Sequence, residues 1–249
     1  MPDSALITLR RFTTARVGLG RAGNSVSTRD LLDFQLAHAR ARDAVHHPFD
    51  PHAVVAEVEA CGLQSTLVSS AARSRIEYLR RPDLGRRLDE ASSQGLRQCS
   101  GPFDVVFIVA DGLSPLAVQT QAAQLIRAVT DRLGQTWRIA PVVIATQGRV
   151  ALSDEIGALL GADLAVMMIG ERPGLSSFDS MGVYLTWSPR PGRTDADRNC
   201  ISNIRPEGLS IGAASELLSL LMHESRARRV SGVTLKPENA VRIGDAGSH

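Results

Sequence analysis

Lysine is nearly missing from this chain: Lys236 is the only one, so almost all of its positive charge is arginine. The net charge is only +2, which gives no argument from bulk charge for nucleic acid or an anionic membrane as a partner. No apolar run approaches the roughly 20 residues of a membrane span, and the N-terminus lacks the apolar core of a signal peptide. We therefore expect a soluble, cytoplasmic protein.

Cysteine is also scarce, and no cysteine–histidine cluster is present. Cys61, Cys99 and Cys200 are widely spaced and odd in number, which argues against a disulfide framework or a zinc site and favours a reduced compartment. Asp50-Pro51-His52 begins like the D-x-H-x-x-G signature of proteins that ligate cobalt through histidine, but position 55 is Val instead of Gly. Paired carboxylates, a Ser/His/Asp order and a P-loop are absent as well. The residues therefore predict no metal ligand and no catalytic group.

From about residue 59, strand and helix patterns alternate. Apolar strands are predicted at 64–69, 103–109, 138–145, 164–169 and 183–187, and helices at 83–97, 115–133, 153–160 and 210–224. Near-continuous apolar strands separated by helices are typical of an α/β protein with a Rossmann-like, mostly parallel sheet and helices on both faces. A capping pattern at Ser27 and Asp30 predicts an earlier helix at 29–45, with Leu31 and Phe34 on one face. We expect a small helical N-terminal region, 1–58, followed by a Rossmann-like domain, 59–249.

Two polar loops are the best candidates for a ligand site. Gly170-Glu171-Arg172-Pro173-Gly174 comes directly after a buried strand, and residues 198–208 form a second polar loop that contains Cys200. Ligands of open parallel sheets bind outside the carboxyl ends of strands, so we expect a site at the loops around residues 150, 171 and 200. Asp111 follows the predicted strand at 103–109. It is either a ligand group or a turn residue before a helix cap at Ser114. Cys200 has no histidine nearby in the sequence to activate it as a nucleophile.

A glycine motif supports an alternative function. Gly18-Leu19-Gly20-Arg21-Ala22-Gly23 matches the dinucleotide fingerprint G-x-G-x-x-G. That motif requires a strand before it and a helix that opens at the third glycine, whereas residues 10–16 make a poor strand and 24–27 form a polar spacer. A stand-alone nucleotide-binding oxidoreductase is thus the alternative, and an interaction module with an arginine-rich docking face is a third hypothesis.

Several uncommon strings, which occur in one order over roughly residues 10–236, resemble the small (light) subunit of ethanolamine ammonia-lyase. They are Gly20-Arg21-Ala22-Gly23, Ala37-His38-Ala39-Arg40-Ala41-Arg42-Asp43, Tyr78-Leu79-Arg80-Arg81-Pro82-Asp83-Leu84-Gly85-Arg86-Arg87-Leu88, Asp111-Gly112-Leu113-Ser114, Gly148-Arg149-Val150, Gly170-Glu171-Arg172-Pro173-Gly174-Leu175 and Cys200-Ile201-Ser202-Asn203-Ile204.

The resemblance implies a subunit and not a complete enzyme. It implies a Rossmann-like domain after a helical N-terminal part, in an enzyme that converts ethanolamine to acetaldehyde and ammonia by a radical mechanism. This chain would help to hold adenosylcobalamin against a large TIM-barrel subunit, within a higher hetero-oligomer. The large subunit would carry the radical chemistry and the substrate contacts. The cofactor would keep its own base on cobalt, so that no protein histidine ligand is needed.

By motif match, the family's cobalamin contacts fall on Val150, Glu171 and Cys200. The resemblance implies that the Glu171 carboxylate accepts hydrogen bonds from the cofactor, and that Val150 and Cys200 pack against it. We expect the N-terminal helix to face the large subunit. Some members carry a longer N-terminal extension that targets a bacterial microcompartment, while this chain starts almost at the shared region. The expected location is therefore the cytoplasm, with encapsulation through other partners as the alternative.

Overall fold

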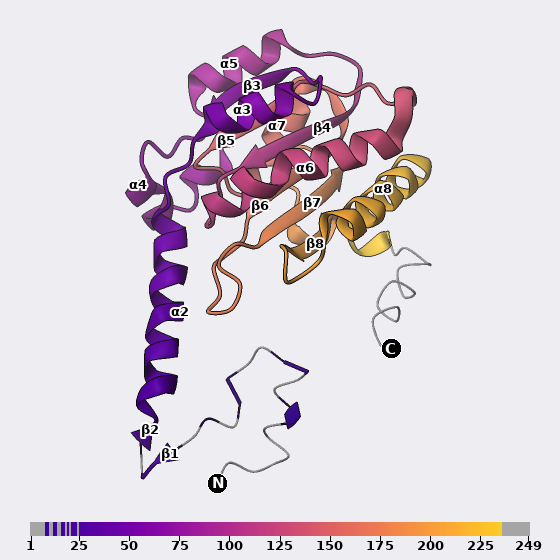
Figure 1. The fold of residues 1–249 in the computed structure, drawn as a ribbon. Helices are drawn as coiled ribbons and strands as arrows, with labels where there is room; N and C mark the ends of the chain where they lie inside the picture. Colours follow the sequence, from indigo (N-terminus) through magenta and orange to yellow (C-terminus); the bar gives the residue numbers. More distant parts are fainter. Residues whose placement is uncertain are drawn as a thin grey trace.

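The computed structural model describes residues 8–9, 12–13, 16–17, 19, 21–23 and 25–235. It is built around one six-stranded sheet with the strand order β3-β5-β4-β6-β7-β8 (Figure 1). The strands are β3 (Ser65–Ser69), β4 (Phe103–Ala110), β5 (Val142–Thr146), β6 (Ala162–Gly170), β7 (Met181–Trp187) and β8 (Arg198–Ile204).

The sheet is mostly parallel, as the sequence predicts, with an antiparallel extension at one edge. Strands β3, β5, β4 and β6 pair in parallel, whereas β7 pairs antiparallel with both β6 and β8. Strand β8 consequently runs in the same direction as β6. Gly170, Met181 and Ile204 lie in one row across these three strands, so the carboxyl ends of β6 and β8 meet at the same edge of the sheet.

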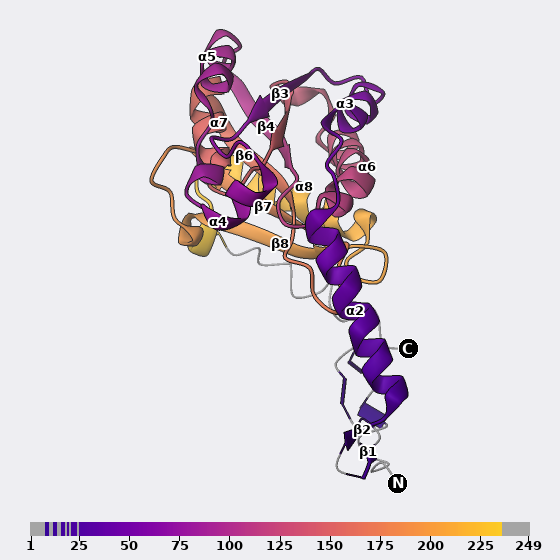
Figure 2. The same ribbon diagram turned by 90° about the vertical axis from the view of Figure 1, so that its left-hand side faces the viewer.

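Helices cover both faces of the sheet, which confirms the predicted α/β class. Figure 2 shows α5 (Glu90–Gln98) and α7 (Leu152–Leu160) on one side, and α3 (Pro51–Glu59), α6 (Pro115–Leu133) and α8 (Ile211–Arg228) on the other. Because strand side chains alternate, Val105 and Phe107 belong to the core under α6, while Val106 and Ile108 belong to the core under α7. The structure thus has two hydrophobic layers separated by one buried sheet.

Helix α2 (Thr28–His46) stands away from the sheet (Figures 1 and 2). Its start is as predicted, because the Ser27 side chain accepts a hydrogen bond from the Asp30 amide. The face predicted to be apolar is largely uncovered: Leu31 and Phe34 are 48% and 43% exposed. A short antiparallel pair, β1 (Arg21–Ala22) and β2 (Ser25–Val26), precedes the helix.

Three predicted elements differ from the structure. The strand expected at 138–145 begins only at Val142, and Ile139 forms no more than an isolated bridge to Val105. The single helix expected at 83–97 is a 3-10 turn, Leu84–Arg86, followed by α5, because the Asp89 side chain caps a new helix by accepting from the Ser92 amide. The polar loop expected at 198–208 begins as strand β8. Its charged first residue, Arg198, is accommodated inside the protein by Asp154 of α7, with an Nη2–Oδ2 distance of 2.6 Å.

The N-termini of two helices also differ from the prediction. Helix α7 is preceded by Ala151 at the cap position, and the Ser153 hydroxyl donates to the Val150 carbonyl inside the first turn. Helix α3 was not predicted at all. Asp50 caps it by accepting from the amides of His52 and Ala53, which gives the Asp50-Pro51-His52 string a purely structural explanation. Within the part of the chain that the structure describes, no helix is long and apolar enough to span a bilayer.

Candidate functional site

The three predicted cofactor residues lie on the α7 side of the sheet. Side chains on β7 alternate, and Val183 packs into the core under α6 and α8, so Gly182 and Tyr184 face the α7 side. Cys200 of β8 lies directly opposite Tyr184, and Val150 packs against the same hydrophobic cluster as Tyr184. Glu171 lies over Gly182, where an added Cβ would be only 2.9 Å from Glu171 Oε1.

The Glu171 carboxylate is held by two protein donors. The Ser180 hydroxyl donates to Glu171 Oε2 at 2.5 Å, and the Asn203 amide donates at 3.3 and 3.4 Å to the two oxygens. A carboxylate has about four lone-pair directions, so these donors leave capacity for a ligand. Glu171 is therefore a fixed acceptor at the carboxyl end of β6.

Cys200 and Tyr184 form an uncharged patch beside this carboxylate. Tyr184 and Cys200 are directly opposed residues of β7 and β8. Partial burial, with a contribution from the negative charge of Glu171, raises the pKa of the Cys200 thiol; burial first, and then Cys200, raises the pKa of Tyr184. Both side chains are protonated at neutral pH, so Cys200 is suited to packing and not to nucleophilic attack.

The crevice between the carboxyl ends of β4 and β5 is the topological switch point of the sheet, since the chain leaves β4 toward α6 and leaves β5 toward α7 on the opposite face. The protein fills this crevice itself, with side chains of α4 (Arg75–Arg80). Two guanidinium groups lie over the Tyr78 ring, with the Cζ atoms of Arg75 and Arg149 at 4.9 and 4.3 Å from its centroid. Tyr78 is 1% exposed.

Asp111 is the anionic partner within this filled crevice. Its Oδ1 accepts from the amides of Gly112 and Gly148, and Arg75 Nη1 lies 3.4 Å from Oδ2. The sequence left open whether Asp111 is a ligand group or prepares a cap at Ser114. It is a buried internal anchor instead, and the Ser114 hydroxyl donates to the Phe178 carbonyl without capping α6.

The glycine motif does not open a helix in the structure. Gly18 and Gly20 lie outside the described residues, while Gly23 has a φ of +64° in the connection between β1 and β2. Helix α2 begins only at Thr28. Because the helix N-terminus is what binds the pyrophosphate in a dinucleotide site, this geometry does not support the oxidoreductase alternative.

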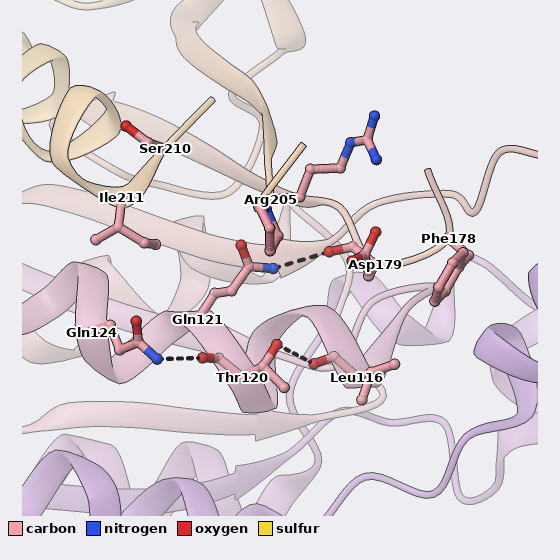
Figure 3. Close-up of a pocket in the computed structure, with 10 residues that line it drawn as sticks. Leu116, Thr120, Gln121, Gln124, Phe178, Asp179, Arg205, Ser210 and Ile211 are labelled. Atoms are coloured by element: carbon pink, nitrogen blue, oxygen red, sulfur yellow. Dashed lines mark hydrogen bonds between the residues drawn. The ribbon is translucent and has the colours of Figure 1, made fainter. Parts of the chain in front are cut away.

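Figure 3 shows a separate hollow of about 470 Å³ on the α6 and α8 side of the molecule. Leu116, Gln121, Phe178 and Ile211 are among its lining residues, and none of the three predicted cofactor residues borders it. A smaller hollow of about 350 Å³ adjoins Ala151, next to Val150, and its lining carries both signs of charge (Arg86, Arg87, Arg193, Asp154 and Glu155). Among the described residues, no group of histidine, cysteine and carboxylate side chains is arranged to hold a metal ion.

Sequence reasoning missed Ser180, Tyr184 and Asn203, which surround the predicted residues. Ser180 and Tyr184 come close to Glu171 and Cys200 only because β7 turns back antiparallel between β6 and β8. Asn203 has a φ of +61°, a conformation that asparagine adopts more often than most residues. Its place in the polar segment after Cys200 was the only signal in the sequence.

Together, the fold and this cluster define an open-sheet α/β protein with its polar groups gathered beside the carboxyl ends of β6 and β8. Comparison with known proteins identifies the family. The profile described as "Ethanolamine ammonia-lyase light chain" matches residues 3–236. The chain belongs to this family, whose members are subunits of a carbon–nitrogen lyase.

Similar proteins match over nearly their whole length. Each of the following is named ethanolamine ammonia-lyase small subunit. The protein of Pseudomonas aeruginosa is 52% identical over 254 residues, covering 98% of this chain and 93% of the relative. That of Ralstonia nicotianae is 54% identical over 244 residues, with 96% and 90% covered. That of Azotobacter vinelandii is 54% identical over 246 residues, with 96% and 91% covered.

Proposed function

We propose that this chain helps to bind and orient adenosylcobalamin in an ethanolamine ammonia-lyase, at the interface with a large TIM-barrel subunit. The observation that supports this best is the cluster on the α7 side of the sheet. There, a fixed carboxylate, Glu171, lies beside the uncharged pair of Tyr184 and Cys200. The large subunit carries the substrate contacts and the reaction on ethanolamine.

The chemistry of these side chains fits a large ring with amide groups at its rim. Glu171 has capacity to accept from amide or hydroxyl donors, and such charge-assisted bonds are worth about 1.5–3 kcal/mol each. Val150 and Cys200 supply uncharged surface for packing.

When bound, adenosylcobalamin supplies a cobalt–carbon bond that breaks to give the radical which starts the reaction. The residues of this chain hold and orient the cofactor and exclude water from one of its sides. None of the side chains that we assign to the cofactor is a histidine, so in this proposal the cobalt keeps the cofactor's own base.

We also propose that the large subunit covers α2. Four large apolar side chains of this helix are exposed: Leu31, Leu32, Phe34 and Leu36. The last turn of α2 is joined to the carboxyl edge of the sheet, because Arg75 Nε donates to the Val45 carbonyl at 2.9 Å and Arg75 Nη1 donates to the Gly112 carbonyl at 2.7 Å. A subunit that covers α2 would therefore also reach the edge that carries Glu171.

Alkylation of cysteine tests the cofactor site directly. The purified complex of this chain with its large subunit is treated with N-ethylmaleimide, with and without cobalamin, and the modification of each cysteine is followed by mass spectrometry. We expect cobalamin to slow the modification of Cys200 at least about tenfold, because a ligand packed on the sulfur blocks its access.

Cys99 provides the matched control. It is exposed and lies at the end of α5, before β4 begins, and so at the opposite edge of the sheet. Its rate of modification should not depend on cobalamin. Equal modification of Cys200 with and without the cofactor would contradict the proposed site, and deamination of ethanolamine without cobalamin would contradict the proposed function.

A further inference from the structure

We propose that Asn203 is a positioning residue for the cofactor site, a role that rests on the function proposed above for Glu171. The backbone N–H of Asn203 holds the Glu171 carboxylate in the orientation that contacts the cofactor. A β-bulge in β8 aims this N–H at Glu171.

The bulge lies opposite Gly182, the residue over which Glu171 lies. Between the pairs Met181–Ile204 and Val183–Ile201 the register of β7 and β8 shifts, so Ser202 and Asn203 together face Gly182. Bulges leave a residue outside the regular ladder and redirect its groups, often next to functional sites. Here the N–H of Asn203 donates to both Glu171 oxygens, at 3.3 and 3.4 Å.

The direction of this N–H depends on the left-handed conformation of Asn203, with a φ of +61°. For most L-residues, that region costs roughly 1–2 kcal/mol, and asparagine and glycine tolerate it best. The orientation of the Glu171 carboxylate therefore depends on whether residue 203 can adopt this left-handed backbone conformation. The side chain of Asn203 faces a different partner.

A turn after β8 keeps Asn203 in this conformation. The Leu209 amide donates to the Asn203 carbonyl at 2.8 Å, and Arg205 Nε donates to Asn203 Oδ1 at 2.8 Å. A Cβ on Gly208 would overlap the Asn203 carbonyl oxygen, so the turn requires glycine there. These contacts make the bulge and the turn one rigid unit.

Arg205 connects this unit to the loop that carries Glu171. Its Nη1 donates to the Ser176 carbonyl at 3.0 Å, and the residue is only 9% exposed. Arg205 and Asp179, a residue of the same β6–β7 loop, both line the hollow drawn in Figure 3. At the other end of that loop, the Glu171 amide donates to the Ser180 carbonyl at 2.9 Å. Hydrogen bonds thus fix both the loop that carries the Glu171 carboxylate and the turn that carries its donor, the Asn203 amide.

Two substitutions separate the backbone role from the side-chain role. Asn203→Gly removes the side chain but keeps the left-handed conformation accessible, so cobalamin affinity of the complex should stay within about threefold of wild type. Asn203→Val disfavours that conformation, and affinity should fall about tenfold, equivalent to about 1.4 kcal/mol. Affinity is measured by equilibrium dialysis of cobalamin against the complex, and the thermal unfolding midpoint is recorded for each variant.

The same substitutions in a Glu171→Ala background test whether Asn203 acts through Glu171. There, Asn203→Val should weaken cobalamin binding less than twofold, because the group that it positions has gone. Equal weakening in both backgrounds, or no weakening in either, would overturn the inference. So would loss of binding in Asn203→Gly as large as that in Asn203→Val.

The design keeps the two proposals apart. If Glu171→Ala weakens binding and Asn203→Val does not, only the positioning role fails. If Cys200 is not protected by cobalamin, the proposed function fails whatever the result at Asn203. Should Asn203→Val not fold, Asn203→Ala gives the same comparison, because alanine strains the same φ with a smaller side chain.

Discussion

At the scale of single residues, burial of Asp111 makes ionisation of its carboxyl group unfavourable. Burial raises its pKa to about 6, although Arg75 and the amides of Gly112 and Gly148 favour the anion. In the unfolded chain the same group has a pKa near 4. Between about pH 4 and pH 6 the native state therefore holds more protons than the unfolded state, and this group makes the protein less stable as the pH rises.

We expect Asp111→Asn to remove this pH dependence. A shift of about two pKa units corresponds to about 3 kcal/mol between pH 3 and pH 7. The free energy of unfolding is measured by urea denaturation at several pH values. Between pH 3 and pH 7 it should fall by up to about 3 kcal/mol more in the wild-type protein than in Asp111→Asn. Parallel curves for the two proteins would show that Asp111 titrates normally. Asp163, an exposed aspartate, provides a control in Asp163→Asn.

At the scale of elements, β8 depends on one buried ion pair. Arg198 and Asp154 have side chains only 2% and 3% exposed, and two guanidinium nitrogens reach the carboxylate at 2.7 and 2.6 Å. The pair joins the first residue of β8 to α7. Thr186 of β7 accepts a further bond from Arg198 at 3.0 Å.

Removing one member of the Arg198–Asp154 pair should destabilise the protein far more than replacing both members. Asp154→Ala leaves a buried, unpaired guanidinium, so we expect a loss of about 3–5 kcal/mol in the free energy of unfolding. A double variant with Asp154→Leu and Arg198→Met should recover much of that loss, because it buries no charge. Chemical denaturation measures both. A loss below about 1 kcal/mol in Asp154→Ala would contradict the structural role of the pair.

Strands β4 and β6 were predictable because they are buried on both faces and therefore read as continuous apolar runs. Strand β8 was not, because it begins with an arginine whose partner is 44 positions earlier in the chain. Local patterns contain no information on such a distant partner. Helix α3 was missed for a related reason: its Asp50 cap resembled part of a ligand motif.

At the scale of the whole molecule, motif matching could name Val150, Glu171 and Cys200 but could not supply their surroundings. The contacts from Ser180 and Asn203 to Glu171 arise from the antiparallel return of β7 and from the bulge in β8. The sequence contains the residues of these features, and only the pairing of the strands brings them together. Whether the three named residues bind a cofactor stays a prediction.

Assembly should change the environment of α2 more than that of the sheet. In the complex with the large subunit, we expect amides near Leu31 and Phe34 to exchange with deuterium at least about tenfold more slowly than in the free chain. Amides of β4, which are already buried, should change little. Hydrogen exchange followed by mass spectrometry measures both. Unchanged exchange along α2 would show that the large subunit binds elsewhere.

The filled switch-point crevice has a consequence for selectivity. Nicotinamide and adenine nucleotides are abundant metabolites, and in folds of this type that crevice is where they would compete for binding. Arg75 and Arg149 lie over the buried Tyr78 ring, so entry of a nucleotide would require displacing these side chains and exposing the Asp111 carboxylate. We therefore expect nucleotides to bind poorly in this crevice, which leaves the flank beside β8 as the place for the cofactor that we propose.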